Sequence, residues 1–281
     1  MTDYLDFEVD PGNPEVAATF DELTYWSALF GQLLFRHLPL APGLTVLDVG
    51  CGTGFPLFEL ADRLGPTSTV HGIDAWPQAV ERARLKARVR GCTNVHVTHG
   101  DAATLPYDDG VFDLIVSNVG LNNFDAPATV MAECHRVSKP DARVNLTTNL
   151  VGHMRELYEL YEQVLVDTGN TDRVEALHRQ EAHRATPEGL HQLYTDAGFE
   201  VTAFHTQTFQ LRYADGSALF RAYLSRVGFV DGWRGILGDP NLEVAIFEEL
   251  EARLNHSAQE SPEGLRLTIP AAYIEGRKLG S

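Results

Sequence analysis

Short apolar runs alternate with longer segments of helical periodicity between residues 45 and 148. The runs are rich in β-branched residues, as in strands that are buried on both faces. The longer segments repeat apolar residues every three or four positions, which is typical of helices with one buried face. This alternation predicts βαβ units with right-handed crossovers. The expected strands are 45–49, 69–73, 95–99, 112–117 and 142–147, and the expected helices are 56–64, 77–90 and 126–137.

Residues that start and stop helices support this pattern. Pro77 and Pro127 fall in first helical turns, and Asp125 is the expected N-cap of the helix that follows it. Thr186 before Pro187 predicts the start of a further helix in the same way.

The segments outside this core are predicted to be mostly helical. Residues 21–37 carry apolar side chains on one face, and residues 214–264 repeat Leu242, Ile246 and Leu250 at helical spacing. Because structureless loops of such length are uncommon in compact domains, the second segment is expected to be a helical insertion or lid. Strands are expected at 200–204 and 265–274.

Together these elements predict an α/β fold: a Rossmann-like, doubly wound, mostly parallel seven-stranded sheet with N-terminal helices and a helical insertion before the last strand. The expected parts are an N-terminal helical cap (1–43), a cofactor-binding core (44–213), the insertion or lid (214–264), and the last strand with the tail (265–281).

Charge argues against nucleic acid and anionic membranes as partners. The 281 residues include 39 acidic and 22 basic side chains, which gives a net charge of −17. A surface of this sign repels phosphate unless basic residues cluster, and the basic residues between Arg82 and Arg90 are spaced like one solvated helix face.

Cysteine usage and the N-terminus point to a soluble, cytoplasmic protein. The three cysteines have no CxxC spacing, so neither a disulfide framework nor a metal site is expected. The acidic N-terminus lacks the apolar stretch of a signal peptide, and no apolar run approaches the length that spans a bilayer. The oligomeric state is left open.

The segment VLDVGCGTG, residues 46–54, carries the strongest chemical signal. It reads as a strand that runs into a glycine-rich turn, where Gly50, Gly52 and Gly54 allow the backbone to turn sharply and to approach a ligand closely. Asp74 ends the next strand, where a carboxylate can accept both hydroxyls of a ribose. Asp101 follows the third strand.

Three carboxylates, those of Asp48, Asp74 and Asp101, should therefore meet at the carboxyl edge of the sheet. They would repel a pyrophosphate, and the turn has no lysine of the kind that a P-loop uses. A ligand with cationic and hydrogen-bond-donor groups suits them better. S-adenosylmethionine has an ammonium, a sulfonium, a ribose diol and an adenine amine, and it has no phosphate.

The glycine motif, the acid of GIDAW, the segment GDAATLPYDDGVFDLIVSN and the order of elements resemble class I S-adenosylmethionine-dependent methyltransferases of the small-molecule kind that includes quinone-biosynthesis enzymes. The resemblance covers residues 44–204. It implies that S-adenosylmethionine is the cofactor and that the turn glycines line its methionine part. The cofactor-binding residues that it implies are Asp48, Gly50, Cys51, Gly52, Gly54, Asp74, Ala75, Trp76, Asp101, Ala102 and Asn118.

Within this set, the resemblance places Asp48 near the ammonium, Asp74 at the ribose and Trp76 against the adenine. Asp101 would accept from the adenine amine, and main-chain carbonyls near Asn118 would accept from the ammonium. Plain structural alternatives stay open: Asp48 as a cap of the turn, Asp74 or Asp101 as solvated strand-end acids, and Trp76 as core.

The methyl acceptor should enter beside the loop 118–124. That loop lacks the NPPY-like motif of nucleic-acid amino methyltransferases, which favours a small molecule. Asn122 is a candidate for orienting the acceptor, although asparagine also serves turns. His153 is a candidate base, with a surface histidine as the alternative. Candidate substrate contacts are Tyr25, Phe124 and Tyr158, and aromatic residues of the late insertion could form an apolar lid or plain core.

Two other functions share some of these features. A nucleotide-dependent oxidoreductase would use the glycine turn and the ribose acid, but the glycines lack the GxGxxG spacing and Asp48 and Asp101 stay unexplained. A non-catalytic cofactor-binding protein would have all of the same cofactor-binding residues. Methyl transfer itself is an in-line displacement that needs alignment above all, and it needs a base only where the acceptor must lose a proton.

Overall fold

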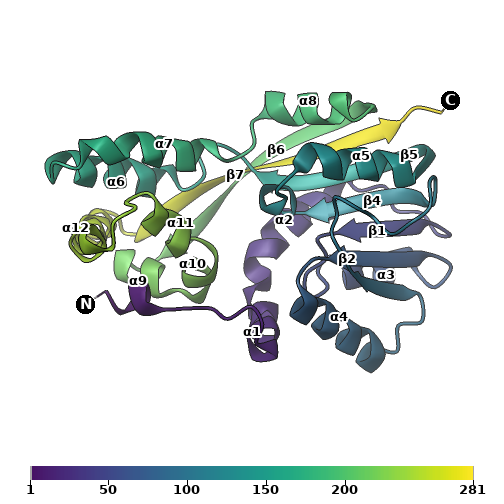
Figure 1. The fold of residues 1–281 in the computed structure, drawn as a ribbon, viewed down its shortest axis with the longest axis horizontal. Coiled ribbons are helices and arrows are strands. Elements are labelled where there is room, and N and C mark those ends of the chain that lie inside the picture. Colours follow the sequence, from purple (N-terminus) through teal and green to yellow (C-terminus); the bar gives the residue numbers. More distant parts are fainter. Residues whose placement is uncertain (1, 281) are drawn as a thin grey trace. The chain divides into compact units, whose positions relative to one another are not determined.

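A single seven-stranded sheet with helices on both sides organises the chain, in the strand order β3-β2-β1-β4-β5-β7-β6. The computed structural model describes residues 2–280, apart from the side chains of residues 22–24. The predicted fold class is confirmed (Figure 1). The strands are β1 (Thr45–Val49), β2 (Thr69–Asp74), β3 (Val95–His99), β4 (Phe112–Asn118), β5 (Ser138–Asn149), β6 (Phe199–Tyr213) and β7 (Leu265–Lys278).

The helices fall largely where the periodicity predicts them, and the late insertion is helical. Short 3-10 helices occur at Asp3–Asp6, Phe20–Leu23, Leu121–Asn123 and Thr171–Arg173. The α-helices are α1 (Pro14–Thr19), α2 (Thr24–His37), α3 (Leu57–Leu64), α4 (Pro77–Arg90), α5 (Pro127–Val137), α6 (Arg155–Asp167), α7 (Val174–Ala182), α8 (Pro187–Asp196), α9 (Gly216–Arg221), α10 (Tyr223–Gly228), α11 (Val230–Gly235) and α12 (Pro240–Gln259).

The strand order reverses at β1, and this positions the site. β1 pairs in parallel with β2 on one side and with β4 on the other, and its residues from Val46 onward are buried. Val49, the last residue of β1, lies opposite Ile73 in β2. Loops that leave the carboxyl ends of β1, β2 and β4 therefore start side by side, at the switch point where such sheets bind ligands.

β6 and β7 form an antiparallel hairpin at one edge of the otherwise mostly parallel sheet. Thr202 donates its hydroxyl hydrogen to the Glu275 carboxylate at 2.6 Å, and Glu200 pairs with Arg277. Farther along, Arg212 donates to the carbonyl of Glu263. Residue numbers that rise on one strand as they fall on the other are the pattern of antiparallel pairing.

One expected helix cap is confirmed and another is wrong. The hydroxyl of Thr186 accepts a hydrogen bond from the Gly189 N–H at 3.0 Å, as predicted for the start of α8. Asp125, in contrast, does not cap α5. Pro127 fixes the first helical position, so the N-cap is Ala126, which has no side-chain acceptor.

The chain folds into two compact units. The first unit takes the N-terminal residues through Val9, Asn149–Arg184 and Thr208–Pro270. The second takes Asp10–Thr148, Ala185–Gln207 and the residues from Ala271 onward. The second unit holds β1 to β4 and helices α1 to α5 and α8; the first holds α6, α7 and α9 to α12.

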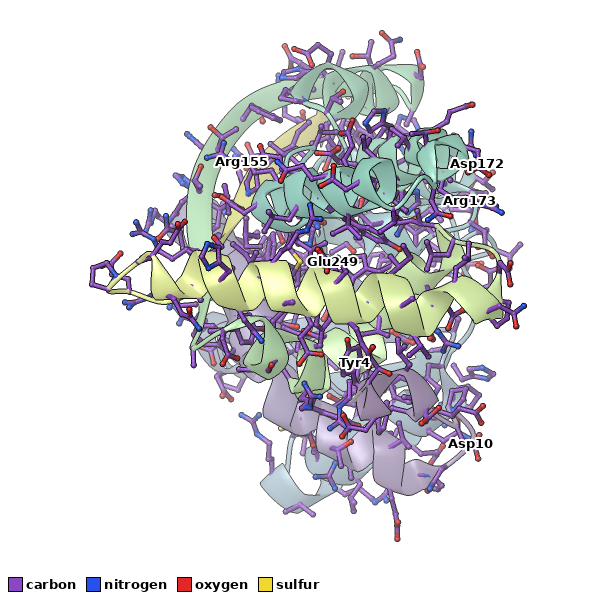
Figure 2. The ribbon with its side chains drawn as sticks, turned by 90° about the vertical axis from the view of Figure 1, so that its left-hand side faces the viewer. Tyr4, Asp10, Arg155, Asp172, Arg173 and Glu249 are labelled. Atoms are coloured by element: carbon purple, nitrogen blue, oxygen red, sulfur yellow. The ribbon has the colours of Figure 1, made fainter. Side chains whose placement is uncertain are left out.

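An aromatic cluster forms the core of the first unit. The rings of Tyr4 and Phe220 stack with centroids 4.9 Å apart, and Phe220 also contacts Trp233 and Phe247. Figure 2 looks onto α12, with Glu249 labelled on it and Tyr4 below it. Aromatic pairs of this kind add about 0.5–1.5 kcal/mol each beyond their burial. Phe220 and Trp233 belong to the aromatic residues of the late insertion for which a lid or plain core was expected, and both are core in this unit.

None of the helices found between residues 2 and 280 is long and apolar enough to cross a membrane.

Candidate functional site

The glycine-rich turn after β1 is held by backbone hydrogen bonds and has a glycine at each position where the backbone takes a positive φ angle. Gly50 and Cys51 both donate their N–H to the carbonyl of Ile73, at 2.9 and 3.1 Å. Gly50, Gly52 and Gly54 have positive φ angles of 76°, 51° and 110°. A Cβ on Gly54 would lie 2.2 Å from the Phe58 ring, whereas one on Gly52 would meet no protein atom within 4 Å. The turn is packed from below at Gly54 and open above Gly52.

Asp74, at the end of β2, ties this turn to the next one. One carboxylate oxygen accepts the Gly52 N–H and the other accepts the Trp76 N–H, both at 2.8 Å. Each oxygen keeps a second lone pair, and the residue is only half-buried. Asp74 therefore fixes the shape of the glycine turn and can still accept hydrogen bonds from a ligand.

Asp48 is completely buried beneath the turn, and neither of its carboxylate oxygens accepts a hydrogen bond. Burial, followed by the negative charge of Asp74, raises the pKa of Asp48 well above its usual value. The backbone N–H of Leu57 acts in the opposite direction and lowers this pKa, but it does not form a hydrogen bond with the Asp48 carboxyl. An unpaired buried carboxyl costs free energy, so Asp48 is poised for a cationic or hydrogen-bond-donating partner.

Cys51 packs under the turn. Its side chain is fully buried, and its sulfur would lie 2.8 Å from a Cβ built on Gly72. Burial, and then the charges of Asp48 and Asp74, raise the pKa of the Cys51 thiol well above its usual value. A thiol held neutral in this way is a packing group and not a nucleophile.

The residues that follow β2 lie at the surface beside the turn. Ala75 is exposed, and Trp76 is half-buried with its ring edge-on to Phe20, at 4.8 Å between centroids. The Trp76 indole N–H donates to the Pro11 carbonyl at 2.7 Å. Trp76 thus presents a fixed apolar ring next to Asp74.

Asp101 and Ala102 follow β3. Asp101 is exposed, and its carboxylate accepts the Ala103 N–H at 2.8 Å in a local turn. This turn leaves the second carboxylate oxygen of Asp101 and the half-buried Ala102 at the same edge of the sheet as Asp74.

The loop after β4 closes over the first glycine. The Ser117 hydroxyl donates to the Val49 carbonyl at 2.7 Å. The Asn118 amide donates to the Ser27 carbonyl in α2, and its oxygen accepts from Thr147. The Phe124 ring lies 3.8 Å from the Cβ position of Gly50. Phe124 is therefore brought to the glycine turn, whereas the Asn118 side chain is held between Ser27 of α2 and Thr147 of β5.

The N-terminal segment of the second unit surrounds the same turn, which the sequence pattern does not indicate. Asp21 forms ion pairs with Arg82 and Lys86, and Lys86 also donates to the Thr53 carbonyl at 2.7 Å. A Cβ on Gly31 in α2 would lie 2.4 Å from the Phe55 ring, so this helix packs tightly on the turn. Pairings between residues so far apart in the chain have no local signal in the sequence.

Two further candidates, Tyr25 and Asn122, lie in the second unit. Tyr25 on α2 is 65% exposed. Asn122 lies in the 3-10 helix after β4 and is half-buried.

His153 and Tyr158 lie in the first unit and so belong to a different compact body from the glycine turn. His153 is 2% exposed, and its ring lies 5.6 Å from that of Phe229. Burial, and then the charge of Arg184, lower the pKa of His153 to about 3. Burial raises the pKa of Tyr158. Both side chains are thus neutral near pH 7, and His153 is a far weaker base than an imidazole in water.

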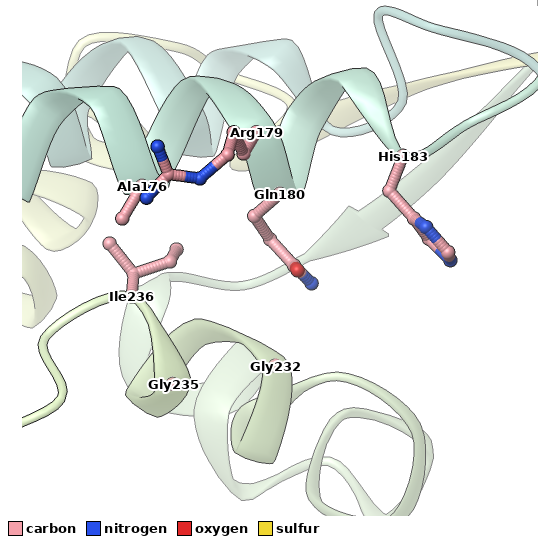
Figure 3. Close-up of a pocket in the computed structure, with 7 residues that line it drawn as sticks. All are labelled: Ala176, Arg179, Gln180, His183, Gly232, Gly235 and Ile236. Carbon is pink, nitrogen blue, oxygen red and sulfur yellow. The ribbon is translucent and has the colours of Figure 1, made fainter.

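The first unit also carries an open groove of about 400 Å³ between α7 and α11. Figure 3 shows Arg179, Gln180 and His183 on the α7 side, facing Gly232 and Ile236. None of the predicted site residues lines it. Among the described residues, no group of three or more histidine, cysteine, aspartate or glutamate side chains is arranged to hold a metal ion.

The class of protein follows from this geometry. The second unit is a doubly wound sheet with a glycine turn at its switch point, an acid after β2 and an unpaired buried carboxyl below the turn. The buried carboxyl and the open space above Gly52 fit a cofactor that carries a cation and a ribose, and they do not fit a pyrophosphate. These features define a binder of S-adenosylmethionine.

Comparison with known proteins agrees. The family described as methyltransferase domain matches residues 40–198. Nocamycin O-methyltransferase of Saccharothrix syringae is 33% identical over 246 residues, which cover 84% of this chain and 86% of the relative. Demethylmenaquinone methyltransferase of Geobacillus kaustophilus is 31% identical over 186 residues, which cover 63% of this chain and 79% of the relative.

Among solved structures, a SAM-dependent methyltransferase from Aquifex aeolicus has the same fold, with a TM-score of 0.53 and 22% identity over 68% of this chain and 91% of the other. The chain belongs to the class I S-adenosylmethionine-dependent methyltransferases. Its cofactor is S-adenosylmethionine, and the oxidoreductase alternative is set aside.

Proposed function

We propose that the chain transfers the methyl group of S-adenosylmethionine to an oxygen of a small-molecule acceptor by in-line displacement. The choice of a small molecule and of oxygen rests on the nocamycin O-methyltransferase relative. Its match runs over 246 residues and so extends well beyond the family domain at 40–198. A strongly acidic chain without an NPPY-like loop also favours a small molecule over nucleic acid.

The observation that carries the donor side of this proposal is the unpaired carboxyl of Asp48. A fully buried carboxyl without a hydrogen bond is costly in an isolated fold, and a bound ammonium would offset that cost. Asp74 would accept from the ribose hydroxyls, Trp76 would pack on the adenine, and Asp101 with Ala102 would hold the adenine edge. Gly50, Gly52, Ala75 and Asn118 would complete the contact surface, and Gly54 and Cys51, both buried, would shape the turn from below.

On the acceptor side, the chain supplies alignment and exclusion of water. When bound, S-adenosylmethionine supplies a methyl carbon that its sulfonium already activates. Phe124 over Gly50 would shield the reacting centre, and Asn122 and Tyr25 would contact the acceptor. Alignment of this kind contributes about 7–11 kcal/mol in favourable cases. We propose no base role for His153, because its low pKa leaves it little affinity for a proton.

The experiment that tests this function is a screen of metabolite extracts with S-adenosylmethionine that carries an isotopically labelled methyl group. The expected result is one or a few small molecules that gain a single labelled methyl on oxygen, together with release of S-adenosylhomocysteine. Label that appears only in protein or nucleic acid, or on carbon or nitrogen of the product, would contradict the proposed acceptor.

Replacing Asp48 by asparagine should change how cofactor binding and stability depend on pH. Because the folded-state pKa of Asp48 is raised, the native protein keeps this proton above pH 3.8, where the unfolded chain loses it. The protonated carboxyl of Asp48 therefore contributes to stability at low pH, and the free energy of unfolding falls as the pH rises through the raised pKa. Asp48→Asn should remove this fall in the unfolding free energy with pH.

Pairing with an ammonium should, in addition, drive the proton off Asp48. Binding of S-adenosylhomocysteine should then release a proton, measured by calorimetry in buffers of different ionisation enthalpy between about pH 5 and 8. Asp48→Asn should abolish the release. Asp62→Asn, which changes an exposed carboxyl paired with Arg90, is the matched control and should keep it. Equal proton release by Asp48→Asn would rule out the role of Asp48.

A further inference from the structure

The segment that joins β3 to β4 crosses the sheet without a helix. In the strand order β3-β2-β1-β4, two strands lie between its ends, and residues 100–111, all of which the structure describes, form turns and irregular structure. Parallel strands are usually joined through a helix, which satisfies its own backbone hydrogen bonds. A crossover without a helix needs partners for its N–H and C=O groups from elsewhere in the fold.

Arg136, in the last turn of α5, supplies several of these partners. Its guanidinium donates to the carbonyl oxygens of Leu105 at 2.9 Å and of Tyr107 at 2.8 Å. It also pairs with the carboxylates of Asp109 at 2.8 Å and of Glu133 at 2.7 Å. One planar group with five donor N–H bonds thus binds the crossover at three points, which a lysine with its single nitrogen could not do.

Glu133, one helical turn earlier on α5, binds the same segment. Its carboxylate accepts the Leu105 N–H at 2.8 Å, and both of its oxygens accept hydrogen bonds from Arg136. The hydrogen bonds from Arg136 lower the pKa of Glu133, so this carboxylate is charged near pH 7. Both side chains are half-buried. Glu133 and Arg136, here called the α5 pair, therefore hold Leu105 at its N–H and at its carbonyl.

The crossover begins with the residues that are proposed to hold the adenine. The carboxylate of Asp101 accepts the Ala103 N–H at 2.8 Å, and its carbonyl accepts the Thr104 N–H at 3.1 Å, so these hydrogen bonds close one tight turn. Leu105 follows this turn directly. On the other side, the N–H of the preceding glycine donates to the Asp74 carbonyl at 3.0 Å. The turn is therefore fixed by β2 at one end and by the α5 pair at the other.

We infer that the α5 pair positions the Asp101 turn and thereby sets the selectivity of the donor site for the amine of adenine. This inference rests on the proposed contact between Asp101 and the adenine, and it names two residues that act on that contact without touching the cofactor. A carboxylate accepts a hydrogen bond from an amine, whereas it repels the carbonyl oxygen that hypoxanthine has in the same place. Such selectivity requires that the acceptor is held in position, because a mobile carboxylate would turn away from the wrong base.

The crossover keeps other anchors when the side chain of Arg136 is removed. Gly110 and Val111 donate their N–H groups to the main-chain carbonyls of Arg136 and Val137, at 3.1 and 2.7 Å. These hydrogen bonds do not involve the guanidinium. We therefore expect Arg136 variants to fold and to lose order in the part of the crossover that lies next to Asp101.

The test compares the binding of S-adenosylhomocysteine and S-inosylhomocysteine, which carry an amine and a carbonyl oxygen at the same position of the purine. In calorimetric titrations, the full native chain should bind the adenosine compound about tenfold or more tightly than the inosine compound. Arg136→Gln should bring the two affinities to within about threefold of each other, by lowering the first and leaving the second unchanged. A purely structural role would lower both affinities by the same factor.

Arg84→Gln is the matched control. Arg84 makes similar contacts in the same unit: it pairs with Glu81, three residues earlier on α4, at 2.6 Å, and it donates to the Val97 carbonyl at 3.0 Å. Its replacement removes an equal charge and leaves the crossover held, so the native preference should remain. Arg136→Lys guards against a failure to fold, because it keeps the charge beside Glu133. With one donor nitrogen, it should still lose most of the preference.

The inference is overturned if a folded Arg136→Gln or Arg136→Lys protein keeps the native preference, or loses affinity for both compounds equally. In an Asp101→Ala protein, Arg136→Gln should have no further effect on the preference, because it acts through that carboxylate, and an additive effect would contradict this. A native protein that binds both compounds equally would refute the adenine contact of Asp101 and this inference with it. A native protein that binds neither compound would refute the proposed function itself.

Discussion

Asp74→Ala should weaken the binding of S-adenosylmethionine and S-adenosylhomocysteine by about a hundredfold or more. Each hydrogen bond to an ionised acceptor contributes about 1.5–3 kcal/mol, and the proposed ribose contact uses two of them. The substitution also frees the Gly52 and Trp76 N–H groups, which Asp74 holds at 2.8 Å, so the turn loses its fixed shape. Calorimetric titration with S-adenosylhomocysteine measures the loss directly.

Two further variants make this result specific. Asp62→Ala removes a carboxyl from α3 in the same unit, where it pairs only with Arg90 at the surface, and should bind the cofactor as the native protein does. Asp74→Asn keeps one acceptor oxygen and should lose less affinity than Asp74→Ala. An Asp74→Ala protein with a native circular dichroism spectrum and unchanged affinity would show that the ribose is held elsewhere.

Alanine at Gly52 should block the cofactor while leaving the fold in place. Its Cβ would meet no protein atom within 4 Å, so it would project into the open space above the turn, where the cofactor is proposed to lie. Overfilling a contact surface typically costs about 1–3 kcal/mol, which corresponds to a loss of roughly tenfold to hundredfold in affinity. Alanine at Gly54 should instead unfold the protein, because its Cβ would lie 2.2 Å from the Phe58 ring.

Gly91→Ala is the matched control for Gly52→Ala. Gly91, the C-cap of α4, also has a positive φ, 67°, and open space around its Cβ position. Both substitutions carry the same backbone strain, of about 1–2 kcal/mol, so both should lower the melting temperature slightly. The Gly52 variant alone should lose cofactor affinity. Equal affinities in the two variants would place the cofactor away from this turn.

The central strand β1 could be predicted closely because it is short and buried on both faces, and it has the predicted boundaries, 45–49. The edge strand β3 also has its predicted boundaries, 95–99, although most of its residues are half-buried or exposed. β5 begins at Ser138, earlier than the predicted residue 142. Ser138 already pairs with Phe112 of β4, and the register then shifts at Pro140 and Asp141, where Asp141 has a positive φ of 63°. A proline and a left-handed residue read as loop in a sequence, although here they form a strand irregularity.

The hairpin strands are longer than their sequence indicates. β6 was expected to end at residue 204 and continues to Tyr213. It is an edge strand of the sheet, and the positions on its uncovered face are exposed and carry polar residues such as Thr206 and Thr208. Continuous apolar runs identify strands that are buried on both faces. They underestimate the length of a strand that has only one buried face.

The closeness of Asp74 to the glycine turn could be predicted because both follow strand ends within one local sequence pattern. Asp74 reaches the glycine turn because its strand is the direct neighbour of β1. The link from Asp21 through Lys86 to Thr53 had no such signal, since it joins three distant segments.

Because Cys51 is sealed beneath the glycine turn, a maleimide dye should modify one thiol of the native chain. Burial raises the pKa of the Cys134 thiol to about 12, so it too stays protonated and unreactive. Cys92 is only half-buried, directly after α4, and is the thiol that reagents reach among the three. The natural sequence thus offers a single attachment point for a fluorophore, without any engineered cysteine or any change to the residues that face the donor.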